Sequence, residues 1–253
     1  MRKYIGPLSA AVAFAAPLLA VAQTPPPSPV TGNIALVTDY RFRGLSQTMS
    51  DGPFDFNDGG PALQGGFDYA HPSGLYVGNW NSNVSETLFP NSSLEMDFYG
   101  GYKKTFGDVG ADVGIIYYYY PGSNAPGIGR VDNTELYIGG SWKWLSAKYF
   151  HAIDDFFGVP GTKNSWYLDT NATLDLGGGF GIVAHLGHQK VKGISDADYT
   201  DWKLGVTKDI GGYVFGAAYV DTNAKDSVYT FTDARKTVNI GDATVVLSVA
   251  KTF

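Results

Sequence analysis

From residue 33 to the last residue, apolar and polar side chains alternate in segments of about ten residues. The segments are rich in Tyr, Phe, Val, Ile and Trp, and clusters of Gly, Pro, Asn or Asp separate them. A period of two is typical of β-strands whose two faces differ, and no stretch shows the period of an amphipathic helix. We predict twelve strands, over residues 33–44, 61–71, 74–83, 92–105, 108–120, 132–143, 145–154, 164–176, 179–190, 198–208, 212–221 and 241–253.

The connections between these segments alternate in length. Short turns follow the even-numbered segments, at residues 72–73, 106–107, 144, 177–178 and 209–211. Longer loops follow the odd-numbered segments, at residues 45–60, 84–91, 121–131, 155–163, 191–197 and 222–240. Bacterial outer-membrane barrels have an even strand count with short turns on one side and long loops on the other, whereas soluble sandwiches and lipocalins have no reason to sort loops by length. We therefore predict an all-β fold, a transmembrane antiparallel up-and-down β-barrel in the bacterial outer membrane.

The two faces of each predicted strand differ in polarity. In the segment 92–105, Leu94 and Phe98 share one face, and Glu95 and Asp97 share the other. Lipid cannot solvate charge, so the charged face of a membrane barrel must line the lumen. The predicted pore-lining residues are Asp39, Arg41, Arg43, Gln64, Asp68, Glu95, Asp97, Lys103, Asp112, Glu135, Asp169, Asp201 and Lys203.

Aromatic residues concentrate toward the ends of the predicted strands. Rings with a polar edge are well solvated at the two lipid–water interfaces, so we expect aromatic girdles facing lipid. The candidates are Tyr40, Phe42, Tyr69, Tyr76, Trp80, Trp142, Trp144, Tyr149, Trp202, Tyr213 and Tyr219. The last strand alternates apolar residues and ends in Phe253, a pattern that outer-membrane barrels present to the barrel-assembly machinery.

The first 32 residues differ from the rest of the chain. Arg2 and Lys3 precede an apolar stretch that ends in an Ala-Val-Ala cleavage site, so residues 1–22 read as a secretory signal peptide. Residues 23–32 are rich in proline, which cannot donate to a sheet, and we interpret them as a short lead-in. The domain organisation that follows is signal peptide, lead-in and a single barrel over residues 33–253.

Composition excludes several classes of function. The chain has 253 residues and no cysteine, which excludes thiolate zinc sites, iron–sulfur clusters and thiol nucleophiles. Its 18 Lys and Arg against 24 Asp and Glu give a formal charge of -6, so no basic surplus exists to displace the counterions of nucleic acid. We expect no nucleic-acid partner, no cofactor and no metal.

Three segments carry a resemblance to a known family. They are residues 32–47 (GNIALVTDYRFRGLSQ), 61–69 (PALQGGFDY) and 74–83 (GLYVGNWNSN). Together they resemble the TorF family of porin-like proteins of proteobacteria, with the similarity concentrated in the first hundred or so residues. The resemblance implies an outer-membrane barrel of porin type and brings no substrate with it.

Twelve strands lie between eight-stranded barrels, whose interior is filled with side chains, and porins of sixteen or more strands, which enclose wide channels. A narrow pore for passive diffusion of small hydrophilic solutes or ions is the natural hypothesis. Charges of both signs across a lumen can also pair and plug it, which would leave a structural or surface-interaction barrel without transport. The sequence is compatible with both functions.

Arg41 and Arg43 place two positive charges close together on the lumen face of the first predicted strand. We expect them near the outer end of the first strand, beside Gln64 and Asp242, where they either attract anionic solutes or are neutralised at the barrel seam. The acidic loop 45–60 either folds inward as a constriction or binds cations weakly.

Lipid hydrolysis is a third, weaker alternative. His71 and Ser73 are two residues apart, the spacing that places a nucleophile and its base on one face of a strand. Pro72 between them predicts a turn instead, so we expect no enzymatic activity.

Overall fold

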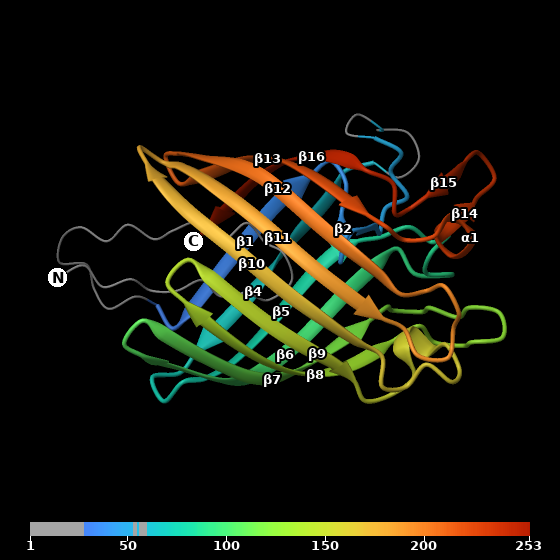
Figure 1. Ribbon diagram of the computed structural model, residues 1–253, viewed down its shortest axis with the longest axis horizontal. Coiled ribbons are helices and arrows are strands. Elements are labelled where there is room, and N and C mark those ends of the chain that lie inside the picture. Colours follow the sequence, from blue (N-terminus) through green and yellow to red (C-terminus); the bar gives the residue numbers. More distant parts are fainter. Residues whose placement is uncertain (1–27, 53–54, 56–59) are drawn as a thin grey trace.

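The computed structural model describes residues 28–52, 55 and 60–253, and within them twelve strands close into one antiparallel barrel (Figure 1). The predicted signal peptide lies outside the described residues. The barrel strands are β1 (Val30–Val37), β4 (Ala62–Ala70), β5 (Leu75–Asn83), β6 (Leu94–Phe106), β7 (Val109–Tyr119), β8 (Asn133–Trp142), β9 (Leu145–Ala152), β10 (Trp166–Gly177), β11 (Phe180–Lys190), β12 (Tyr199–Ile210), β13 (Tyr213–Thr222) and β16 (Thr244–Thr252). The predicted strand number and all-β class are confirmed.

The barrel closes where the first strand meets the last. β1 pairs with β4 on one side and with β16 on the other, in register from Asn33 opposite Thr252 to Val37 opposite Ser248. Closure leaves no free strand edge, so the backbone groups of every barrel strand have a partner, as a hydrocarbon environment requires. Among the described residues, no helix has the length and apolar character needed to cross a membrane.

The remaining elements are short and are not part of the barrel wall. β2 (Arg41–Phe42) pairs with β3 (Leu45–Ser46), and β14 (Thr230–Thr232) pairs with β15 (Thr237–Asn239). A single turn of helix, α1 (Asp226–Tyr229), precedes β14, and a 3-10 turn, η1 (Phe156–Gly158), follows β9. Figure 1 shows α1, β14 and β15 with the long loops at one end of the barrel and the tight turns at the other. We name these the loop end and the turn end.

The outer surface of the wall is apolar. Leu36, Phe67 and Ile138 are 47%, 62% and 63% exposed, and they stand for a belt of large exposed hydrophobic side chains around the barrel. A soluble monomer rarely exposes an apolar surface of this extent, because the hydrophobic effect opposes it. The predicted assignment of apolar positions to the outside is therefore confirmed for the barrel strands.

The aromatic girdle prediction is wrong for four residues. Tyr40, Phe42, Tyr76 and Trp80 lie inside the barrel, and Trp80 is 4% exposed with its ring packed edge-on against Tyr40. The alternation in β5 points its even-numbered residues inward, and Tyr40 and Phe42 belong to a segment that leaves the wall. Rings of the predicted girdle that are exposed on the outside are those of Tyr69, Trp142, Trp144, Trp202, Tyr213 and Tyr219.

Candidate functional site: a hairpin across the lumen

The first strand ends sooner than the alternation predicts. β1 stops at Val37, and residues 38–50 turn into the barrel, where Asp39, Met49 and Ser50 are each at most 1% exposed. We name residues 38–50 the lumen hairpin, because β2 and β3 pair within it. The predicted inward fold of the loop that begins at residue 45 is borne out for residues 45–50, and the hairpin begins seven residues earlier than that loop.

Arg43 and Gly44 form the tip of the lumen hairpin. Phe42 pairs with Leu45, which leaves a two-residue turn with φ of +49° at Arg43 and +81° at Gly44. Positive φ at both positions is typical of a type I′ turn, whose twist matches that of a β-hairpin. A Cβ on Gly44 would lie 2.5 Å from Cβ of Asp201, so glycine is needed here for space as well as for conformation.

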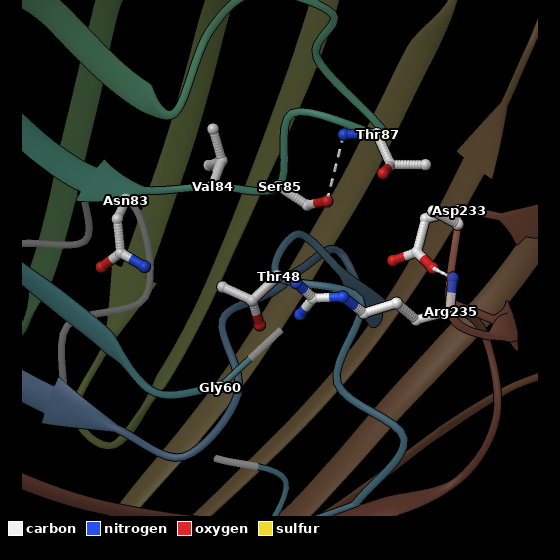
Figure 2. A pocket seen from close by; sticks show the side chains of 9 residues that line it. Thr48, Gly60, Asn83, Val84, Ser85, Thr87, Asp233 and Arg235 are labelled. Atoms are coloured by element: carbon white, nitrogen blue, oxygen red, sulfur yellow. Dashed lines mark hydrogen bonds between the residues drawn. The ribbon is translucent and has the colours of Figure 1, made fainter. Parts of the chain in front are cut away.

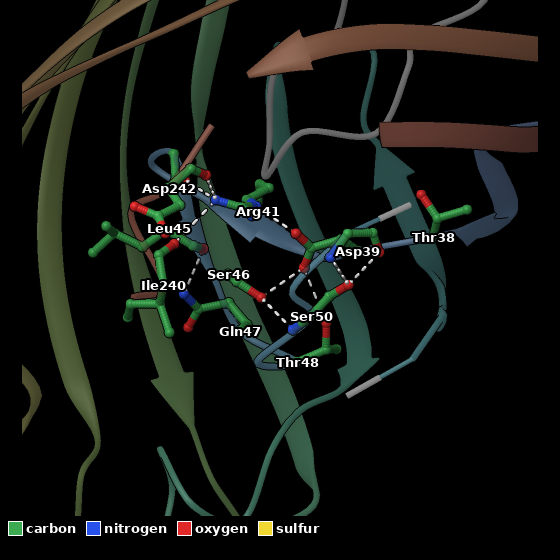
Figure 3. Close-up of polar contacts among 12 residues, drawn as sticks. Thr38, Asp39, Arg41, Leu45, Ser46, Gln47, Thr48, Ser50, Ile240 and Asp242 are labelled. Atoms are coloured by element: carbon green, nitrogen blue, oxygen red, sulfur yellow. Dashed lines mark hydrogen bonds and ion pairs between the residues drawn. The ribbon is translucent and has the colours of Figure 1, made fainter. Parts of the chain in front are cut away.

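Polar contacts fix the base of the lumen hairpin (Figure 3). The Asp39 carboxylate accepts hydrogen bonds from Ser46 Oγ at 2.6 Å and from Thr48 Oγ1 at 3.0 Å, and it forms an ion pair with Arg41. Arg41 Nη1 also donates to the carbonyl oxygens of Ile240 at 3.0 Å and Asp242 at 2.9 Å. Arg41 therefore ties the hairpin to the segment before β16, using the Asp242 carbonyl and not its carboxylate.

The tip reaches the opposite wall through Arg43. Its Nη1 donates to Glu135 Oε1 at 3.1 Å and to Gln189 Oε1 at 2.8 Å, and its Nη2 forms an ion pair with the other Glu135 oxygen. The guanidinium also lies 4.5 Å from the ring centroid of Tyr167. Glu135 is on β8 and Gln189 on β11, two strands that lie across the barrel from β1 in the strand order. The lumen hairpin thus spans the lumen, and a bidentate pair with cation–π support anchors it.

The interior beside the hairpin is dry. Glu95, on β6, accepts hydrogen bonds from Tyr40 Oη at 2.7 Å and from Tyr120 Oη at 2.9 Å, and is 0% exposed. Tyr118 and Tyr120 are 2% and 1% exposed. We name this region, from the lumen hairpin toward the loop end, the loop half of the lumen.

The other half of the lumen is more open. Lys148 Nζ lies 2.8 Å from Asp112 Oδ2, and these side chains are 11% and 24% exposed. Tyr76 Oη donates to Asp112 Oδ1 at 2.6 Å, and Tyr99 Oη donates to Asp68 Oδ1 at 2.6 Å. We name this region, toward the tight turns, the turn half.

A histidine joins two of the predicted carboxylates. His185 Nε2 lies 2.7 Å from Asp201 Oδ1, and His185 Nδ1 lies 2.9 Å from Asp169 Oδ1. His185 is on β11, and the two carboxylates come from its neighbours β10 and β12. Lys203 is in register with His185 on the adjacent strand. Sequence reasoning missed His185 as a lumen residue, although its odd parity in β11, shared with the inward Gln189, was a usable signal.

The predicted lumen-lining residues divide into two groups. Ten come from barrel strands and lie on the inner face, namely Gln64, Asp68, Glu95, Asp97, Lys103, Asp112, Glu135, Asp169, Asp201 and Lys203. The other three, Asp39, Arg41 and Arg43, lie in the lumen hairpin and not in the first strand. Gln64, expected beside the arginines, donates from Nε2 to Ser82 Oγ at 3.3 Å, and the hydrogen bonds of Arg41 and Arg43 go to other residues.

A hollow of about 500 Å³ opens at the loop end (Figure 2). Figure 2 shows the Arg235 side chain extending toward Thr48 of the lumen hairpin, with Asn83, Ser85 and Thr87 on the other side. Its lining is mainly polar and comes from three separate loops, so it forms a vestibule above the hairpin.

His71 and Ser73 do meet, with Nδ1 and Oγ 2.8 Å apart, in the exposed turn between β4 and β5. No carboxylate in the described part of the chain hydrogen-bonds His71, so nothing there orients it as a base. Likewise, residues 28–52, 55 and 60–253 hold no cluster of three or more His, Cys, Asp or Glu suited to a metal ion.

Comparisons with known proteins agree with the architecture. A family model described as "Bacterial protein of unknown function (Gcw_chp)" matches residues 21–253. No curated protein matches the sequence. Among solved structures, a KdgM porin is similar with a TM-score of 0.54 at 10% identity, covering 88% of this chain and 99% of that one. A KdgM porin in complex with disordered oligogalacturonate is similar with a TM-score of 0.52 at 8% identity, covering 88% of this chain and 98% of that one. At such identities the likeness establishes the fold.

Proposed function

Because the chain belongs to the Gcw_chp family of bacterial proteins of unknown function, its activity must be sought in its geometry, and we propose that it is an outer-membrane porin for passive diffusion of small hydrophilic solutes or ions. One observation carries the proposal, namely a closed twelve-stranded barrel that is apolar outside and charged inside. Such a barrel is stable in lipid and offers polar solutes a path that lipid denies them. The proposed activity involves no chemical step.

The proposed function also implies how the barrel is oriented in the outer membrane and which two partners it contacts there. The tight turns face the periplasm and the long loops face the exterior, as in other bacterial barrels. Outer-membrane lipid covers the apolar belt, and the barrel-assembly machinery binds the last strand, β16, together with Phe253. The resemblance of residues 32–47, 61–69 and 74–83 to the TorF family points the same way.

The lumen hairpin supplies the constriction. It crosses the loop half, where the interior side chains are buried, while the turn half keeps half-buried charges that water can reach. Solute enters by the vestibule at Thr48 and Arg235 and passes the hairpin before it reaches the turn half. The barrier to diffusion therefore lies at the hairpin.

The same hairpin favours one alternative, a plugged barrel with a structural or surface role. Arg43 is held by Glu135, Gln189 and several rings in a dry environment, which is what a permanent plug requires. In a plugged barrel the hairpin never leaves its place, and no ion crosses.

Single-channel recording from the refolded mature protein in a planar bilayer separates the two. We expect discrete conductance steps from the wild-type protein, and steps about threefold larger when residues 39–48 are replaced by a short Gly-Ser linker, because a twelve-stranded lumen without its hairpin is wider. The matched control removes residues 126–128 from a loop at the same end, and its steps should equal those of the wild type.

If folded wild-type protein shows no conductance and the linker variant shows conductance steps, the protein is a plugged barrel. If neither the wild type nor the linker variant conducts ions, the protein is not a pore.

A further inference from the structure

Asp97 is a buried carboxylate without a hydrogen-bond partner. It lies on the inner face of β6, is 0% exposed, and neither carboxylate oxygen meets a donor among the described residues. Its neighbours in the loop half do have donors, since Glu95 has Tyr40 and Tyr120, and Glu135 has Arg43 and Tyr118. A buried carboxylate that lacks both a counter-ion and donors is strongly destabilised in its ionised form. A cation beside Asp97 would remove that cost.

The charges around Asp97 do not balance. Glu95 and Asp97 are two residues apart on one strand, about 7 Å between Cα atoms. Arg43 is the guanidinium that the hairpin brings to this depth, and its ion pair is with Glu135. The hydroxyl groups that hold Glu95 are neutral. In their ionised forms, Glu95, Asp97 and Glu135 therefore carry more negative charge than Arg43 neutralises.

A second unpaired polar side chain lies in the same row. Asn133, on β8, is 0% exposed, and neither its amide oxygen nor its amide nitrogen has a partner in the described part of the chain. Tyr118 is in register with Asp97 on one side and with Asn133 on the other. Carboxylate and amide oxygens are ligands of hard cations, and rings of such groups select cations in channels.

Arg41 and Arg43 do not make the constriction attractive to anions. Arg41 is held by Asp39 and by backbone carbonyl oxygens, and Arg43 is held by Glu135 and Gln189. A guanidinium whose donors already face carboxylate and carbonyl oxygens adds little attraction for a passing anion.

We infer that the constriction selects small cations, and that Asp97 is the carboxylate that a permeating cation contacts, with the Asn133 amide oxygen beside its path. The inference rests on the proposed porin function and names its solute class. The contact is transient, because one carboxylate and one amide do not make a closed metal site.

The test is the reversal potential of the full-length mature protein in a bilayer under a KCl gradient. We expect the wild type to favour K⁺ over Cl⁻, and Asp97→Asn to lower the permeability ratio about fivefold, because the carboxylate that pairs with the permeating cation is lost. Asp108→Asn, in the exposed turn before β7, removes the same charge outside the loop half and should leave the ratio unchanged. Millimolar Ca²⁺ should reduce the wild-type current and spare the Asp97→Asn current.

Asn133→Asp provides a second test in the opposite direction. It adds a carboxylate to the same row, so the preference for K⁺ should rise, and this holds even if Asp97→Asn fails to fold. An anion-selective wild type, or equal ratios in wild type and Asp97→Asn, overturns the inference while leaving the porin function intact. Absence of conductance from both the wild type and the hairpin-replaced variant overturns the function and the inference together.

Discussion

The two halves of the lumen share one wall and differ in what fills them. In the loop half, Glu135 and Gln189 are 0% and 1% exposed, and each meets the tip of the lumen hairpin. In the turn half, Lys148 and Asp112 also form an ion pair, with Nζ 2.8 Å from Oδ2, but their side chains remain 11% and 24% exposed. The strands continue unchanged from one half to the other, so the difference comes from the hairpin and from loop side chains such as Phe89 and Phe157 that pack beside it.

The strength of an ion pair in this barrel therefore depends on which half contains it. In the dry half, a charge without its partner meets neither water nor salt, so breaking a pair is costly. In the wet half, solvent compensates for the lost partner. The loop half can thus hold the hairpin and discriminate between solutes, whereas the turn half provides a hydrated exit.

The largest effect is expected from Glu135→Gln, which leaves Arg43 buried opposite a neutral amide. The free energy of unfolding should fall by about 3–5 kcal/mol, because an uncompensated buried charge remains. Asp112→Asn is the matched change in the turn half, where Lys148 stays partly hydrated, and it should cost about 1 kcal/mol. Urea unfolding of the refolded barrels in detergent micelles measures both. Equal losses would contradict the distinction between the halves.

A smaller effect is expected at the tip of the lumen hairpin. Gly44→Ala adds a Cβ that would lie 2.5 Å from Cβ of Asp201 and 2.6 Å from Cγ2 of Thr222, at a φ of +81°. Strain and overlap together should cost about 2–3 kcal/mol in the same unfolding assay. Gly127 has a φ of +76° with nothing near its missing Cβ, so Gly127→Ala isolates the backbone strain, about 1 kcal/mol. If the two variants lose the same stability, the tip is not packed against the wall.

The wall was predictable from the sequence because a strand in a barrel has only two faces. Period-two alternation placed Leu94 and Phe98 outside and Glu95 and Asp97 inside, and the structure agrees. Turn residues such as Pro72 marked the ends of strands, where the backbone must reverse. Both signals are local, so a single sequence contains them.

The lumen hairpin was only partly predictable because its contacts are not local. Arg41 and Arg43 continue the alternation of the first strand, so the pattern alone extends β1 past Val37. What turns the chain inward is the pairing of Arg43 with Glu135, 92 residues away, and of Arg41 with carbonyl oxygens near residue 240. Arg43-Gly44 was the local signal for a tight turn, and it is a weaker one than Asn-Gly or Asp-Gly.

The smallest effect is expected at the rim of the barrel, where a third ion pair joins Lys190 and Asp198 with side chains 38% and 35% exposed. Partial desolvation opposes ionisation of Asp198, but the hydrogen bonds from Lys190 and from the Val191 N–H, at 2.8 Å, outweigh it and hold the pKa of Asp198 below its ordinary 3.8. A lowered pKa in the folded state stabilises the fold above the ordinary pKa, and this stabilisation is lost as the pH falls through the lowered value.

Asp198→Asn should therefore cost about 0.5 kcal/mol at neutral pH and low salt, and nothing at a pH well below 3.8 or in high salt. Unfolding titrations of both proteins at several pH values would measure this difference, and a cost as large as that of Glu135→Gln would mean that exposure does not set the strength of ion pairs in this barrel.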